Sequence, residues 1–95
     1  IMKDILVVGK LKEEKFEKFM GFMQSDVGIN ERKKIADLTK TLGTVSPDKN
    51  SVMFKIAVHN EDALHAFLDG TNPVSGPIFE EVMESYEIFT ISKIK

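Results

Sequence analysis

Three side chains in the sequence have types and spacing suited to act on a small molecule. Lys55 and His59 lie four residues apart in a segment that alternates with apolar residues, so both should project from one side of a strand. An ammonium group near an imidazole could stabilise a carboxylate or enolate and transfer a proton. Alternatively, the lysine extends to the edge of an apolar surface or pairs with a carboxylate such as Glu87. Tyr86, the sole tyrosine, offers either a hydroxyl to a ligand or a packed ring with a hydrated tip.

A metal site would need both histidines, His59 and His65, together with Glu61 or Asp62. The histidines fall on different predicted elements and lack the close spacing of metal-binding motifs. His65 has acids four residues to either side, Glu61 and Asp69, which suits a solvated charge pair on a helix. The chain has no cysteine, which excludes thiolate metal sites, iron–sulfur clusters and cysteine nucleophiles. Motifs for haem, flavin and nucleotides are also missing, so we expect no metal and no cofactor.

Charge and hydropathy narrow the classes of function further. The chain has 13 basic and 15 acidic side chains and a net charge of −2, the wrong sign for a general nucleic-acid binder. No lysine or arginine lies between Ile56 and Ser92. No apolar run approaches the ~20 residues of a membrane helix, and the start lacks the features of a signal peptide. We expect a cytoplasmic protein that binds neither nucleic acid nor membrane.

The elements that must position these side chains follow from changes in the apolar period along the chain. Unbroken or alternating apolar residues predict strands, and apolar residues three and four apart predict helices. Pro, Gly and Asn residues mark the ends of the predicted helices and strands. The predicted elements are a strand over residues 3–10, a helix over 12–25, a short helix capped by Asn30 and running to Ala36, strands over 37–46 and 51–59 around a turn, a helix capped by Asn60 and ended by Gly70, a helix that begins at Pro77, and a strand over 86–94.

This order, β–α–β–β–α–β, is that of the ferredoxin-like α+β fold, with both helical regions broken in two. Right-handed crossovers place the first and third strands in the middle of an antiparallel sheet of order 4-1-3-2. Both helical regions then lie on one face. The length of 95 residues suffices for one such domain, spanning residues 1–95.

Large apolar side chains fall on both faces of the predicted sheet. On the first strand, Ile5 and Val7 project to one face of the sheet and Leu6 and Val8 project to the other. On the third strand, Met53 projects to the face away from Val52 and Phe54. A sheet face that helices leave open should be polar if water covers it. Either this face is only moderately apolar and stays exposed, or two copies pack sheet against sheet as a homodimer.

The β–α–β–β–α–β order, the length, the two apolar sheet faces and the broken first helix resemble the dimeric α/β-barrel superfamily. Its members include cofactor-independent monooxygenases, haem-degrading enzymes, small isomerases, stress-responsive barrel proteins and uncharacterised single-domain families. The resemblance implies a homodimer whose two sheets close a barrel. Haem-degrading members use an Asn–Trp–His set, and this chain has no tryptophan. Stress-responsive members carry a histidine on the first strand, and residues 1–11 contain none. The sequence therefore resembles an uncharacterised single-domain member.

In such a barrel, Met53, Lys55, His59 and Phe89 would line the lumen and Tyr86 would lie near its mouth. An apolar pocket with few polar anchors suits an apolar small molecule that carries an acidic or carbonyl oxygen. Lys55 would hold that oxygen, and His59 or Tyr86 would add a hydrogen bond. Three functions remain open: ligand binding without catalysis, which we expect; a cofactor-independent monooxygenase- or isomerase-like enzyme; and a structural or interaction dimer whose own side chains fill the lumen.

Overall fold

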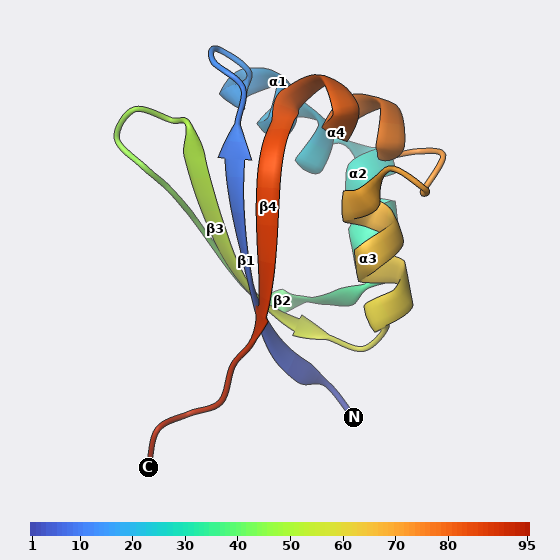
Figure 1. Ribbon diagram of the computed structural model, residues 1–95. Coiled ribbons are helices and arrows are strands. Elements are labelled where there is room, and N and C mark those ends of the chain that lie inside the picture. Colours follow the sequence, from blue (N-terminus) through green and yellow to red (C-terminus); the bar gives the residue numbers. More distant parts are fainter.

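Four antiparallel strands and four short helices make up the chain, and the computed structural model describes residues 1–95 (Figure 1). In chain order the elements are β1 (Lys3–Leu11), α1 (Phe16–Met23), α2 (Asp26–Lys33), β2 (Ala36–Val45), β3 (Ser51–Val58), α3 (Glu61–Asp69), α4 (Gly76–Val82) and β4 (Met83–Thr90). The sheet order β2-β3-β1-β4 is the predicted order read from the other edge. The predicted α+β fold is therefore confirmed, and the sheet of one chain is open, with β2 and β4 at its edges.

All four helices lie on one face of the sheet, as predicted (Figure 1). The main hydrophobic core fills the space between them and the sheet. Ile5 and Val7 of β1 face this core. Phenylalanine rings from the helices meet above them, with the ring centroids of Phe67 and Phe79 5.0 Å apart in an edge-to-face arrangement. We call the opposite side of the sheet, which no helix covers, the open face.

The second helix begins earlier than predicted. The sequence placed its N-cap at Asn30, but α2 starts at Asp26, and the Oγ of Ser25 accepts a hydrogen bond from the backbone N–H of Gly28. The same hydroxyl donates to the carbonyl oxygen of Phe22. Gly28 lies so close to α1 that a Cβ atom there would be 1.9 Å from that oxygen. The segment that looked like a helix break is thus the start of α2.

Two other predicted boundaries are corrected. The first helix begins at Phe16 rather than residue 12, because Glu14 has a left-handed φ of 64° that helical backbone does not allow. The last strand is Met83–Thr90 rather than 86–94, because α4 passes directly into extended backbone at Met83. The predicted caps of α3 are confirmed: Asn60 accepts from the N–H of Ala63, and Gly70 is left-handed.

An irregularity interrupts β2 where it pairs with β3. Asp37 lies opposite Ala57, and Leu42 lies opposite Lys55. Between these two pairs β2 has four residues, 38–41, whereas β3 has only Ile56. The carboxylate of Asp37 accepts hydrogen bonds from the backbone N–H and the hydroxyl of Thr39, which hold this segment in its turn. These bonds also lower the pKa of Asp37. We call residues 38–41 the β2 bulge.

No helix in the structure is long and apolar enough to cross a membrane.

Candidate functional site

The strand register brings three of the predicted site residues together on the open face. Lys55 lies opposite Leu6 on β1, and Leu6 lies opposite Phe89 on β4. Met53 occupies the next open-face position of β3. Met53 and Phe89 are 44% and 45% exposed, and Leu42, beside Lys55 on β2, is 61% exposed. The open face therefore combines large apolar side chains with one lysine near its centre.

Lys55 has no charged partner within the chain. No carboxylate lies within ion-pair distance of its ammonium group, and the pairing with Glu87 that the sequence suggested does not form. Glu87 lies opposite Val8 in the neighbouring row of the same face. The open face thus carries Lys55 without an ion pair, together with the carboxylates of Glu87 on β4 and of Asp4 on β1, which form no ion pair either.

Tyr86 and His59 lie away from Lys55. Tyr86 is opposite Gly9 on β1, on the helix-covered face, where its ring packs against the core. His59 follows the end of β3, and its Nε2 lies 3.1 Å from the carbonyl oxygen of Lys33 at the end of α2. The structure thus separates both side chains from the lysine they were predicted to assist.

The remaining histidine belongs to no cluster of metal ligands. His65 is exposed on α3, near Asp69, whose pKa is lowered mainly by hydrogen bonds from the hydroxyl and backbone N–H of Thr71. No group of three or more histidine, aspartate and glutamate side chains gathers closely enough to hold a metal ion.

A cavity of about 60 Å³ lies between the sheet and the helices. Of its 17 lining residues, 14 are hydrophobic. Val7 and Val52 lie at the sheet side, whereas Phe19, Phe67 and Phe79 approach from the helices. Such a lining excludes most hydrogen bonding, so the space favours an apolar occupant.

A glycine and two methionines determine how much space the cavity offers. Gly9 has no side chain at the centre of the sheet, and a Cβ atom there would lie 3.0 Å from the sulfur of Met83. Met83 and Met23 both line the cavity. Methionine is unbranched and adapts its shape readily, so these two walls can move to admit a larger group.

The cavity approaches the surface between α2 and the β2 bulge. Arg32 comes from the last turn of α2, and Leu38 and Thr41 come from the bulge. All three are half-buried, whereas most other lining residues are more deeply buried. The departure of β2 from regular pairing therefore forms the mouth of the cavity.

Arg32 is the only charged residue in the lining. Its Nη1 donates a hydrogen bond of 2.9 Å to the carbonyl oxygen of Met23, the last residue of α1. No carboxylate lies within ion-pair distance of the guanidinium group. Burial without such a partner lowers the pKa of Arg32.

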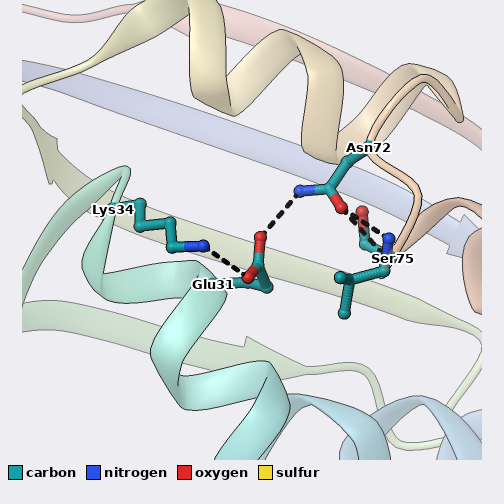
Figure 2. A network of polar contacts seen from close by, with 5 residues as sticks. Glu31, Lys34, Asn72 and Ser75 are labelled. Carbon is teal, nitrogen blue, oxygen red and sulfur yellow. Dashed lines mark hydrogen bonds and ion pairs between the residues drawn. The ribbon is translucent and has the colours of Figure 1, made fainter.

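The acid next to Arg32 in the sequence is engaged elsewhere. Figure 2 shows the carboxylate of Glu31 between the side chains of Lys34 and Asn72, with hydrogen bonds of 2.8 and 3.0 Å. These bonds lower the pKa of Glu31. The hydrogen bond from Asn72 to Glu31 ties the loop between α3 and α4 to α2, and within that loop the amide oxygen of Asn72 accepts from the backbone N–H of Ser75 (Figure 2).

Sequence reasoning missed Arg32, Leu38 and Thr41. One signal was present: Arg32 is the sole arginine of the chain and lies in a predicted helix directly before the apolar pair Ile35 and Ala36. Leu38 and Thr41 gave no signal, because their segment reads as a regular strand rich in threonine.

Comparisons with known proteins support the fold. No protein-family model matches the chain, and no curated protein matches it either. An uncharacterised NIPSNAP domain protein from Burkholderia xenovorans has a similar structure, with a TM-score of 0.65, 19% identity, and coverage of 98% of this chain and 95% of that one. PA3566 from Pseudomonas aeruginosa aligns with a TM-score of 0.63 at 8% identity, over 99% of this chain and 95% of that chain. SO0527 from Shewanella oneidensis aligns with a TM-score of 0.57 at 18% identity, over 96% and 93%.

At these identities the likeness concerns the fold alone. The chain and these three proteins share a small α+β architecture over nearly their whole lengths. The conclusions about the cavity and the open face rest on the residues of this chain.

Proposed function

We propose that the protein binds an apolar small molecule in the cavity between the sheet and the helices. The observation that carries this proposal is the lining itself, in which 14 of 17 residues are hydrophobic and the few polar groups gather at one mouth. An apolar pocket with few, localised polar groups is the usual form of a small-molecule site. The sequence also predicted an apolar small molecule as the ligand, but at the open face of the sheet. The proposed site lies instead on the face that the helices cover.

The size of the cavity limits the ligand. A water molecule occupies about 10–15 Å³ by the same measure, so 60 Å³ holds roughly four groups of that size. An engineered cavity that admits benzene measures ~150 Å³. A short or branched aliphatic body therefore fits as the cavity stands, and a ring requires Met23 or Met83 to move.

The polar groups at the mouth favour binding over catalysis. General acid–base chemistry needs a group whose pKa lies near the working pH. Arg32 stays protonated even with a pKa lowered by burial, and the hydroxyl of Thr41 does not titrate near neutrality. His59 and Tyr86, the titratable residues that the sequence singled out, do not line the cavity.

We also propose that the open face binds a second copy of the chain, giving a homodimer. Three rows of open-face residues on four strands span a footprint of roughly 400 Å² per chain, at ~4.8 Å between strands and ~6.8 Å between rows. Rim residues and the chain beyond β4 extend this area toward the ~800 Å² per partner of a standard interface.

Charge complementarity favours a second copy over an unrelated partner. Lys55 and Glu87 are unpaired within one chain and lie on different strands of the same face. In a two-fold interface, any contact between these residues occurs twice, with each chain supplying one cation and one anion. Such pairing would give both charges a partner at once.

Ligand binding is tested on the purified wild-type protein. Native mass spectrometry followed by denaturing extraction should reveal a co-purified small molecule. Neutral alcohols and ketones of about four carbons should raise the melting temperature, by about 10 °C or more at a hundredfold excess over Kd. The absence of both a bound molecule and any melting shift would contradict the proposal.

The dimer is tested by light scattering at micromolar concentration, where we expect twice the chain mass of 10.7 kDa. Leu6→Asp should yield monomers, whereas Val27→Asp, at an exposed apolar position on α2, should not. Lys55→Glu and Glu87→Lys should each weaken association, and the double variant should restore it. A monomeric wild type, or charge variants that dimerise normally, would refute the interface.

A further inference from the structure

We propose that the ligand carries a carboxylate that Arg32 holds at the mouth of the cavity. This inference rests on the proposed function, because it names the chemical class of the molecule bound there. It also replaces the anchor that the sequence suggested: Lys55 projects from the open face and is not part of the cavity lining.

The guanidinium group of Arg32 has unused hydrogen-bonding capacity. An arginine side chain carries five N–H donors, and the only acceptor for this one is the carbonyl oxygen of Met23. A guanidinium group binds a carboxylate through two parallel hydrogen bonds, which a lysine ammonium group cannot match in geometry. Thr41 also lines the cavity, and its hydroxyl donates only a long hydrogen bond of 3.5 Å to the carbonyl oxygen of Asp37, which it can exchange for one to the ligand.

No carboxylate of the chain is placed to neutralise this arginine. Glu31 is held by Lys34 and Asn72, as Figure 2 shows. The carboxylate of Asp37, directly before the β2 bulge, accepts its hydrogen bonds from the backbone N–H and the hydroxyl of Thr39. A half-buried charge without a counterion is costly, and an anionic ligand would offset that cost.

The surroundings favour a singly charged carboxylate over a phosphate. One arginine supplies one positive charge, and the rest of the lining is apolar apart from Thr41 and the backbone of Gly9. A phosphate monoester would bring nearly two negative charges into this environment. With its carboxylate at the mouth, a branched five-carbon acid places a four-carbon tail in the cavity, which matches both the single charge and the volume of about 60 Å³.

Isothermal titration of the purified protein with isovalerate and isovaleramide tests the inference. The two molecules have nearly the same shape, but only the acid is charged. We expect wild-type protein to bind the acid at least tenfold more tightly than the amide. Arg32→Met should remove this preference by weakening the acid at least tenfold, with little change for the amide.

A neighbouring lysine provides the matched control. Lys33→Met makes the same change of charge on the same turn of α2, but Lys33 is exposed and does not line the cavity. It should bind both molecules as the wild type does. Arg32→Lys, which keeps the charge but loses the planar fork, should retain only part of the preference for the acid.

The outcomes separate the two proposals. Equal affinity of the wild type for acid and amide would overturn the role of Arg32 while leaving the cavity as a binding site. Binding of neither molecule, with no neutral ligand found, would overturn the proposed function itself. The comparison of acid with amide in wild-type protein stands even if Arg32→Met fails to fold for lack of its bond to Met23.

Discussion

Replacement of Val52 by isoleucine tests whether the cavity offers real space. Val52 lies on β3, is 3% exposed and lines the cavity. Val58 is a matched control, because it lies on the same strand and the same face, is equally buried, and does not line the cavity. Each substitution adds one methylene group and keeps the branched side chain that strands favour.

The expected magnitudes follow from the volume of the cavity. At ~24 cal/mol per Å³, an empty space of 60 Å³ costs about 1.4 kcal/mol of folding free energy. A methylene group buried there recovers up to ~0.8 kcal/mol, which corresponds to a melting temperature about 3–6 °C higher. Val58→Ile has no such space, and overpacking a closed core costs roughly 1–3 kcal/mol.

Thermal unfolding followed by circular dichroism measures the difference between the two variants. Ligand must be absent, and the protein concentration must be held constant because dimerisation would make the melting temperature depend on it. Val52→Ile should also weaken binding of isovalerate, since the new methylene group occupies the same space. Equal destabilisation by both substitutions would refute the reasoning, because it would mean that the space beside Val52 is already filled.

Other predictions concern the helices that cover the cavity. Gly21→Ala should stabilise α1 by about 0.5–1 kcal/mol, because a Cβ atom there meets nothing within 4 Å. Gly28→Ala should lower the urea midpoint strongly, because its Cβ atom would collide with the carbonyl oxygen of Phe22; similar midpoints for the two variants would contradict this packing. Glu31→Gln should be less stable than wild type at neutral pH. Because the pKa of Glu31 is lowered in the fold, that difference should shrink as the pH falls below its ordinary value of 4.5. A difference that stays constant between pH 7 and pH 3 would show that the charge of Glu31 is unimportant.

The sheet was predictable because its strands have unambiguous periods. Four large apolar residues, at positions 52, 54, 56 and 58, alternate with Met53, Lys55, Ala57 and His59, and the structure places all four on the helix-covered face. The order of elements then left one arrangement with right-handed crossovers. Boundaries were less predictable where one side chain decides them, as with Ser25 at the start of α2.

The candidate site was predicted only in part, for two physical reasons. Tyr86 and Phe89 are separated by an odd number of positions, so a regular strand places them on opposite faces. The alternation of the last strand therefore already separates Tyr86 from the open face that carries Phe89. The cavity, in contrast, arises between elements that are distant in the sequence, and the β2 bulge that opens it depends on side-chain bonds within Asp37–Thr39. No local pattern encodes such a space.

The two faces of β3 suggest why Lys55 lies where it does. Phe54 and Ile56 line the cavity, and Lys55 projects between them onto the open face. A slip of one residue in the pairing of β3 would exchange the faces and bury the ammonium group among apolar side chains. Burial of an unpaired charge costs several kcal/mol, which is comparable to the total stability of a small domain. Lys55 therefore disfavours the slipped register within one chain, while its charge remains free to meet Glu87 of a second copy. Lys55 thus contributes to the specificity of folding, and the anchor that we propose for the ligand, Arg32, lies on the other side of the sheet.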